Sequence, residues 1–293
     1  MPRSIQQVFS LINSAPVEKL AGFENQSVEL HIKRDDLIHP VISGNKWHKL
    51  KYLLLHLQSQ GYRKIATMGG HYSNFLHVLA FVANQLNWQA TFYIRGHQEQ
   101  PLTPTLQDII EWGAKLVYTS REDFRGLREA PPDLPEDTYW ISEGGMDEYA
   151  IKGFVDSVAD LDEVYDYWVI ASATGTSLAG YQMAVNQNQL KTKVIGIPVL
   201  NNADAIRQNV KHLIGEDQQP ELIEGYEFGG FAKSNDELLE FINQFEQQHS
   251  IPLEPVYTGK SFYAVNDLIN KGYFPSGSKI LLIHCGGLQG RRG

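Results

Sequence analysis

The sequence predicts an α/β protein built on a mainly parallel sheet with helices on both faces. Short β-branched or apolar runs alternate with amphipathic stretches through most of the 293 residues, which is typical of repeated strand–helix units. Many amphipathic stretches begin behind a Gly, Ser, Thr or Asn that suits a helix N-cap. At roughly 150 residues per domain, the length suits two domains or one large α/β domain.

Each predicted strand is a short apolar run, and the predicted helices lie between them. The strands cover residues 28–33, 64–68, 90–95, 116–119, 139–142, 168–172, 193–199 and 280–284. The helices begin near Asn45, Ser73, Thr103, Asp147, Ser177, Ala203, Asn235 and Gly259. The segments 129–137 and 215–220 predict surface loops.

The charge balance excludes some classes of protein. The chain has 25 Lys and Arg against 34 Asp and Glu, a formal charge of −9, which argues against a nucleic-acid or anionic-membrane partner. Cys285 is the only cysteine, so no intrachain disulfide is possible. No apolar run reaches the roughly 18 residues that a bilayer requires, and residues 1–16 lack a signal-peptide pattern. We therefore expect a cytoplasmic protein.

Several catalytic signatures are absent, and one remains as an alternative. The sequence has no P-loop, no dinucleotide fingerprint and no paired histidines or cysteines for a metal, so no metal site is predicted. Gly175-Thr176-Ser177-Leu178-Ala179 nearly matches the G-x-S-x-G nucleophile elbow, although Ala179 stands where the last glycine belongs. A serine hydrolase that uses Ser177 is thus a second hypothesis.

Lys46 stands at the start of a predicted helix, directly after Gly44 and Asn45. A cation in the first turn opposes the helix dipole, which lowers the pKa of an amine and favours its attack on an aldehyde. An ordinary surface lysine on an amphipathic helix is the alternative. The position alone does not decide between the two.

Two predicted strand–turn–helix junctions are suited to anions. Gly69 to Asn74 follows a strand, so Ser73 is a candidate to contact a substrate carboxylate or move a proton, and Asn74 to donate to a ligand oxygen. Ser73 as a plain N-cap is equally compatible. In the second junction, Thr174, Gly175, Thr176 and Ser177 offer consecutive N–H groups and three hydroxyls, which favours phosphate binding.

Tyr257 and the turn at Cys285 to Gly287 are candidates to border the same crevice, although each taken alone is more typical of a packing residue and of turn-forming glycines. The motifs together resemble the pyridoxal-phosphate enzymes of the 1-aminocyclopropane-1-carboxylate deaminase and D-cysteine desulfhydrase family. The resemblance depends on Gly44-Asn45-Lys46, Gly69-Gly70 with Ser73-Asn74, Glu143-Gly144-Gly145, Thr174-Gly175 with Ala179-Gly180, Tyr257-Thr258-Gly259-Lys260 and His284 with Gly286-Gly287-Leu288.

The resemblance implies fold type II, similar to the tryptophan synthase β subunit, with two three-layer αβα domains. A small domain of residues 49–144 would be inserted in a large domain of residues 1–48 and 145–293. Lys46 would hold pyridoxal 5'-phosphate as a Schiff base, and Ser73 and Tyr257 would face the substrate. The other implied cofactor-binding residues are Lys49, Asn74, Thr174, Gly175, Thr176, Ser177, Thr258 and Cys285. A homodimer is also implied.

The implied activity is β-elimination and deamination of a small amino acid, which gives a 2-oxo acid and ammonia. Thr258 indicates a D-cysteine desulfhydrase, since ring-opening deaminases of the family carry glutamate there; 1-aminocyclopropane-1-carboxylate deamination is the alternative. Cys285 replaces a usual threonine near the pyridine nitrogen, His48 a common arginine and Phe75 a frequent histidine, and the phosphate loop lacks the usual glycine pair. A cofactor-binding relative without turnover is therefore a third hypothesis.

Overall fold

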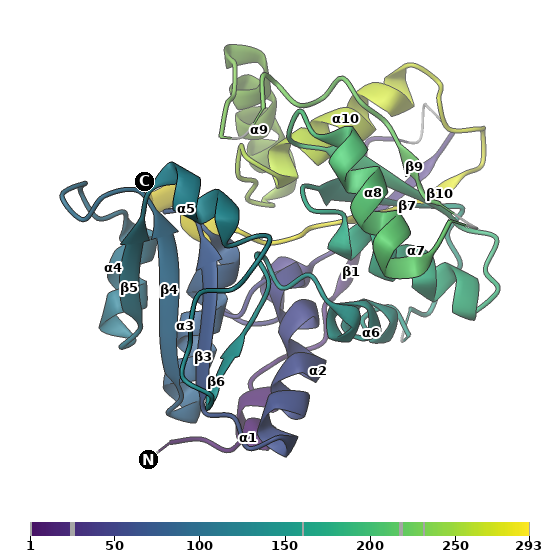
Figure 1. Ribbon diagram of the computed structural model, residues 1–293. Coiled ribbons are helices and arrows are strands. Elements are labelled where there is room, and N and C mark those ends of the chain that lie inside the picture. The colour runs from purple at the N-terminus through teal and green to yellow at the C-terminus, as the bar shows by residue number, and fades with distance from the viewer. Residues whose placement is uncertain (1, 24–26, 160, 217–218, 231, 293) are drawn as a thin grey trace.

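The computed structural model describes residues 2–23, 27–159, 161–216, 219–230 and 232–292. Its strands form two sheets, one in each half of the molecule (Figure 1). The large sheet has the order β1 (Val17–Leu20), β2 (Glu29–Lys33), β10 (Lys279–Ile283), β7 (Tyr167–Ser172), β8 (Lys193–Pro198), β9 (Glu221–Leu222). The small sheet has the order β5 (Lys115–Thr119), β4 (Gln89–Arg95), β3 (Lys64–Gly69), β6 (Thr138–Trp140).

Within the described residues, each pair of neighbouring strands is parallel except β1 and β2, which are antiparallel. The predicted α/β class with mainly parallel sheets is therefore confirmed. The helices are α1 (Ile5–Phe9), α2 (Asn45–Ser59), α3 (Asn74–Leu86), α4 (Pro104–Glu111), α5 (Arg121–Gly126), α6 (Glu148–Asp156), α7 (Thr176–Gln187), α8 (Ala203–Ile214), α9 (Asp236–His249) and α10 (Thr258–Asn270), with short 3-10 turns η2 (Asp35–Leu37) and η3 (Leu288–Arg292).

The large sheet is buried on both faces. Along its central strands, alternate residues point to opposite faces because side chains in a strand have a period of two. Val169 and Ile280 pack with residues of α9 and α10, whereas Ile170 and Leu281 pack with residues of α6, α7 and α8. This half therefore has three layers, as a parallel sheet requires.

The small sheet has its main core on one face. Ile65, Phe92 and Ile94 pack there with apolar residues of α2, α3 and α4. The short helix α5 contacts β4 outside this core. The same core includes Ile5 and Val8 of α1, as well as residues before Lys49: Ile38, Ile42 and Trp47.

This arrangement bears on the domain boundary predicted at residues 48 and 49. Ile5 and Val8 are apolar residues of one short helix, and they reach the small-sheet core because α1 packs on α2 and α3. The backbone N–H of Arg3 also donates to Gln85 O of α3 at 2.8 Å. Residues 1–48 therefore contribute to both hydrophobic cores, and the insertion of residues 49–144 as a domain stays a prediction.

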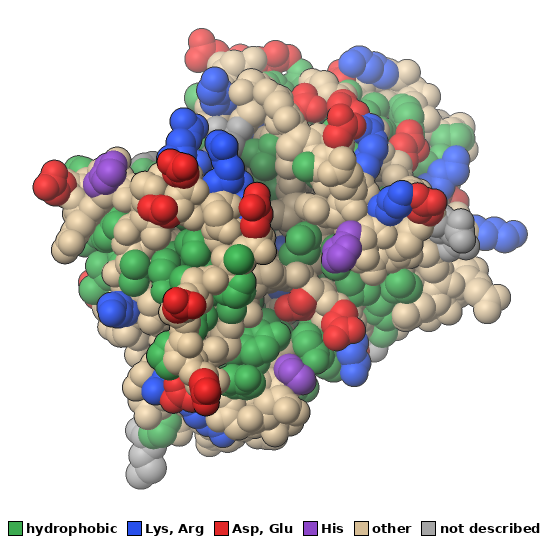
Figure 2. Space-filling view, in the orientation of Figure 1, with side chains coloured by type: hydrophobic (Ala, Val, Ile, Leu, Met, Phe, Trp, Pro, Cys, Tyr) green, Lys and Arg blue, Asp and Glu red, His purple; other side chains and the backbone are tan. Residues whose placement is uncertain are grey.

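The eight predicted strands are confirmed, and the predicted helix starts lie within one residue of those observed. The sequence analysis missed the short elements α1, α5, β1 and β9. Segment 129–137 contains turns and irregular backbone, as predicted; in the second predicted loop, residues 217–218 lie outside the described residues. Among the described helices, none has the length and apolarity needed to cross a bilayer. Acidic and basic side chains are intermixed on the face in Figure 2.

Candidate active site

The start of α2 is packed tightly against the turn that follows β10. Gly44 has a φ of +70°, and a Cβ there would lie only 1.9 Å from the carbonyl oxygen of Cys285. The N–H of Gly44 donates to Asp35 O at 2.7 Å, and the N–H of Asn45 donates to Cys285 O at 3.2 Å. Glycine is required here because only a residue without a Cβ permits this approach. The structure thus brings the start of α2, with Lys46, next to Cys285.

A buried ionic network supports this loop from below. The side chain of Asp35 is fully buried, is paired with Lys33 and lies 3.1 Å from His48 Nε2. Burial opposes ionisation, but Lys33 and His48 hold the pKa of Asp35 well below its usual range. His48, a departure from the family pattern, therefore has a structural role beneath α2.

Lys46 and Lys49 lie in adjacent turns of α2, and both amines are desolvated. Lys46 Nζ donates to Asn45 Oδ1, and Lys49 Nζ donates to Gly144 O at 2.7 Å. Burial lowers the pKa of Lys46, while Cys285 and Glu254 oppose the shift. Burial, and then the charge of Lys46, lower the pKa of Lys49 to about 7. The expected lowering at Lys46 is found, with burial as its largest cause.

The loop before α7 lies directly beside α2. Gly175 caps α7 with a φ of +85°, and Asn45 Nδ2 donates to Ser177 Oγ at 2.9 Å. The hydroxyls of Thr174 and Thr176 lie 3.0 Å apart. The N-terminal N–H groups of α7 and these hydroxyls form a candidate anion site next to Lys46.

Lys49 belongs to the same anion site. A Cβ on Gly144 would lie 3.9 Å from Lys49 Nζ and 3.8 Å from Thr174 Cγ2, so Gly144 lies between these two side chains. The loop is held from behind by Asn209, whose Nδ2 donates to Thr174 O at 3.0 Å. The amine of Lys49 and the N-terminus of α7 therefore converge, which suits phosphate recognition.

The turn after β3 supplies Ser73 and Asn74. Ser73 is the N-cap of α3, since its Oγ accepts from Leu76 N at 3.3 Å, and this confirms the structural interpretation of the residue. Asn74 lies against the turn after β10: its Oδ1 accepts from Gln289, and a Cβ on Gly287 would be 2.4 Å from its Nδ2. Asn74 thus lies at the turn that follows Cys285, whereas the hydroxyl of Ser73 caps α3.

The start of α10 is organised by Glu254, a residue that the sequence analysis missed. Its carboxylate accepts from the N–H groups of Val256, Tyr257 and Thr258 at 2.6–2.8 Å. Thr258 Oγ1 also donates to Glu254 Oε1 at 3.2 Å. The predicted cofactor ligand Thr258 is fully buried and directs its hydroxyl to Glu254. The sequence offered one signal for Glu254, because it is a carboxylate shortly before a predicted helix start.

Two further groups at the site are held neutral. Burial, and then the carboxylates of Glu254 and Glu143, raise the pKa of Tyr257. Burial raises the pKa of Cys285 to about 12, although Lys46 opposes the shift. Tyr257 and Cys285 are therefore a phenol and a thiol at neutral pH, able to donate a proton or a hydrogen bond.

The serine hydrolase hypothesis is not supported. Ser177 lies inside α7, is absent from the residues with positive φ, and its Oγ accepts from Asn45. Across the described part of the chain, no histidine or carboxylate is hydrogen-bonded to this hydroxyl. A nucleophile elbow needs a strained serine with a base beside it, so this interpretation is wrong.

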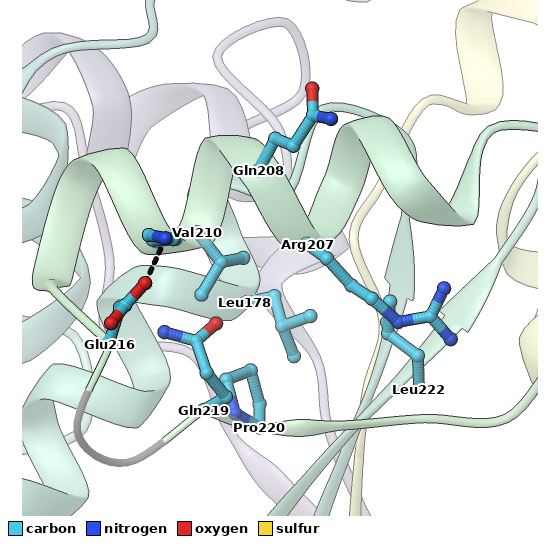
Figure 3. A pocket seen from close by; sticks show the side chains of 9 residues that line it. Leu178, Arg207, Gln208, Val210, Glu216, Gln219, Pro220 and Leu222 are labelled. Atoms are coloured by element: carbon cyan, nitrogen blue, oxygen red, sulfur yellow. Dashed lines mark ion pairs between the residues drawn. The ribbon is translucent and has the colours of Figure 1, made fainter.

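Two cavities border residues that support the site: Leu178 lines the first, and Lys33 and His48 line the second. One, of about 410 Å³, lies between α8 and the segment at Gln219 to Leu222, with Leu178 and Val210 on its wall (Figure 3). The other, of about 720 Å³, is lined by residues of the segment 12–17, β2 and α2. None of the predicted site residues lines either cavity. No group of three or more potential metal ligands is found among the described residues.

Residues 8–286 match a known family, that of the pyridoxal-phosphate dependent enzymes. The chain belongs to this family. The predicted cofactor class and the enzyme class are thereby confirmed, and the parallel-sheet architecture agrees with them.

Individual relatives of this pyridoxal-phosphate enzyme agree with the resemblance found in the sequence. A putative 1-aminocyclopropane-1-carboxylate deaminase of Pyrococcus horikoshii is 31% identical over 94% of the chain and 90% of its own length. A bifunctional, mitochondrial D-cysteine desulfhydrase/1-aminocyclopropane-1-carboxylate deaminase of Arabidopsis thaliana is 27% identical over 92% of the chain and 75% of its length. The crystal structure of a 1-aminocyclopropane-1-carboxylate deaminase homologue matches with a TM-score of 0.83 and 30% identity, covering 100% of this chain and 97% of that one.

The residues at the site fit pyridoxal phosphate. Its aldehyde needs an amine with a lowered pKa, which Lys46 provides, and its phosphate needs an anion site within reach of that amine. The hydrogen bond from Asn45 to Ser177 joins the two, because Asn45 precedes Lys46 and Ser177 belongs to the anion site. Lys49 supplies a second amine, whose charge a bound phosphate would favour, and Cys285 supplies a neutral donor next to Lys46.

Proposed function

We propose that this enzyme catalyses β-elimination and deamination of a small amino acid of the D-cysteine type, producing a 2-oxo acid and ammonia. The observation that carries the proposal is the 2.9 Å hydrogen bond from Asn45 to Ser177, which ties the candidate cofactor lysine to the candidate phosphate loop. The name of the Arabidopsis relative supports the choice of reaction.

In this proposal the anion site holds the phosphate group. Lys49 and the hydroxyls of Thr174, Thr176 and Ser177 would bind it, with Gly175 providing the turn. Asn74 and Cys285 would be the donors to the ring. Thr258 acts through Glu254, which its hydroxyl contacts. When bound, pyridoxal phosphate supplies an electron sink for the charge that remains after Cα loses its proton.

Lys46 has two tasks in the proposed reaction. It would hold the cofactor, and its free amine would take the proton from the substrate Cα. The lowered pKa of Lys46 increases the neutral fraction that a general base needs. Ser73 binds the substrate carboxylate and fixes the direction of the Cα–H bond. Tyr257, with its raised pKa, donates a hydrogen bond to the departing β-substituent.

Opening of the cyclopropane ring is the second candidate activity. It is named in both the Pyrococcus horikoshii and the Arabidopsis thaliana relatives. Thr258 favours the elimination, since the resemblance places glutamate here in ring-opening enzymes. We also expect a homodimer in the cytoplasm with no nucleic-acid or membrane partner, which light scattering and fractionation would test.

The first experiment tests the cofactor and its lysine. Purified protein is titrated with pyridoxal phosphate, followed by visible absorption, reduced with borohydride and mapped by peptide mass spectrometry. We expect a visible band and an adduct on Lys46, both lost in Lys46→Met and retained in Lys152→Met, a matched variant at an exposed lysine of α6. No band in the parent protein would refute the proposed function.

The second experiment tests the reaction. The loaded enzyme is offered D-cysteine, L-cysteine and 1-aminocyclopropane-1-carboxylate, and the 2-oxo acid and ammonia are measured. Turnover of D-cysteine above the other two is expected. Turnover of the cyclopropane alone would select the second candidate. A bound cofactor with no spectral response to a broad amino-acid panel would indicate a relative without turnover.

A further inference from the structure

The segment of residues 286–292, here called the return segment, connects the two halves of the molecule. It follows β10 of the large sheet, and η3 within it packs on α4 beside the small sheet. Figure 1 shows the C-terminal end of the chain on the small-sheet half. The resemblance that identified the site gives no role to any residue beyond Leu288.

Two adjacent arginines attach this segment to different halves. Arg291 forms a two-point ion pair with Glu246 of α9, with N–O distances of 2.6 and 3.1 Å. Arg292 pairs with Asp108 of α4, whose Oδ2 lies 2.7 Å from His77 Nε2 of α3. Each arginine makes paired, charge-assisted contacts, which fix geometry better than single ones. The return segment is therefore held on both sides.

Gln289 lies between these anchors and the site. Its Nε2 donates to Asn74 Oδ1, while Gly287, with a φ of +90°, lies against Asn74 Nδ2. An asparagine amide has one acceptor end and one donor end. Because the side-chain amide N–H of Gln289 occupies the acceptor end, the donor end of Asn74 is left for another acceptor.

We propose that Gln289 is a positioning residue for cofactor binding: it orients the amide of Asn74, and the return segment holds Gln289 in place. This inference rests on the proposed role of Asn74 as a cofactor ligand. Gln289 itself is not placed in contact with the cofactor. It acts by keeping Asn74 in the one orientation that presents a donor to an anionic ring oxygen.

The test is a double-mutant cycle on cofactor affinity. The dissociation constant for pyridoxal phosphate is measured by titration of ligand-free parent, Gln289→Ala, Asn74→Ala and the double variant. We expect Gln289→Ala to raise the dissociation constant about fivefold, the value of one ordinary hydrogen bond. In the Asn74→Ala background the same change should have no further effect, since interacting residues are non-additive.

Controls separate positioning from folding. Gln60→Ala, at an exposed glutamine at the far end of α2, should leave the dissociation constant unchanged. Ligand-free Gln289→Ala should melt within a degree or two of the parent. Gln289→Glu, which cannot donate to Asn74 Oδ1, should weaken binding at least as much as Gln289→Ala.

The outcomes are distinct from those of the proposed function. If the parent binds no pyridoxal phosphate, the proposed function fails first. If the parent binds it but Gln289→Ala has no effect, or has the same effect with and without Asn74, the positioning role is refuted. A fivefold effect that disappears in the Asn74→Ala background supports it.

Discussion

The helices α2 and α10 both begin at the site, and each holds a lysine but no acidic residue in its first turn, yet the polar groups of the two starts are satisfied differently. At α10 the carboxylate of Glu254 accepts from the N–H of Thr258, the first helical residue, and from those of Val256 and Tyr257 before it. Lys260 of α10 donates to three backbone carbonyl oxygens, whereas Lys46 of α2 donates to the side chain of the adjacent Asn45. Lys46 and Lys49 both have lowered pKa values there.

This difference indicates a structural role for the start of α10 and a chemical role for the start of α2. The N–H groups at the start of α10 have acceptors without a ligand, so this turn can hold Tyr257 rigidly. The α2 start concentrates two desolvated amines at the positive end of a helix, which is unfavourable until an anion binds. The residues that cost stability in the ligand-free protein are thus the ones assigned to the cofactor, as is common at functional sites.

The largest expected effect comes from removing the amine of Lys46. Lys46→Met should lower the turnover of the proposed reaction by a factor on the order of 10³ or more, since both attachment and proton transfer are lost. The ligand-free variant should be at least as stable as the parent, because an apolar group replaces a desolvated amine. Steady-state rates and urea unfolding measure the two effects. A variant that keeps a tenth of the parental rate would contradict the assignment.

At α10 we expect a substitution to lower stability, in contrast to Lys46→Met. Glu254→Ala should lower the free energy of unfolding by about 3 kcal/mol, because several buried N–H groups lose their acceptor. Urea unfolding of the ligand-free protein measures it. Glu240→Ala, at an exposed residue of α9, serves as the control and should change stability by less than about 0.5 kcal/mol. Equal stability of the two variants would show that Glu254 is not the support described here.

The alternation of strands and helices could be predicted because it depends on local patterns. The buried run at β7 and the capping residues Ser73 and Asp147 are visible in the sequence itself. The short helix α1 could not be predicted in this way. Its two buried residues, Ile5 and Val8, acquire their environment from α2 and α3, which lie far along the chain.

The same limit applies to the site. Lys46, Asn74 and the loop at Thr174 were predicted because motifs mark them. Gln289 and Glu254 were missed because their contacts depend on how distant turns fold together. Gln289 meets Asn74 across 215 positions of sequence. The helix dipole predicted the direction of the pKa shift of Lys46, but the largest cause of the shift is burial, which depends on tertiary packing.

A smaller effect is expected from the pH dependence of phosphate binding. The pKa of Lys49 is about 7 in the ligand-free protein, and a bound phosphate should raise it. Above pH 7, binding must therefore take up a proton, so affinity falls as pH rises. With pyridoxine 5'-phosphate, which has no aldehyde to react with Lys46, the dissociation constant should rise on the order of tenfold from pH 7 to 8.5. Lys49→Met should bind pyridoxine 5'-phosphate more weakly at pH 7, and its dissociation constant should not rise with pH. An equal rise in this variant would show that another group causes the pH dependence.

The smallest effect is expected at Ser177, where the two interpretations of the loop differ most. If Ser177 belongs to an anion site, Ser177→Ala removes one hydroxyl that accepts from Asn45, while the N–H groups of α7 remain. Cofactor affinity should then fall about fivefold, with the turnover at saturating cofactor within a factor of a few of the parent. Thr176→Ala is the matched variant, since it removes a neighbouring hydroxyl from the same turn. If Ser177→Ala lowers turnover as much as Lys46→Met does, while Thr176→Ala does not, the hypothesis of Ser177 as a nucleophile would be restored. The amines of α2 would then have another role.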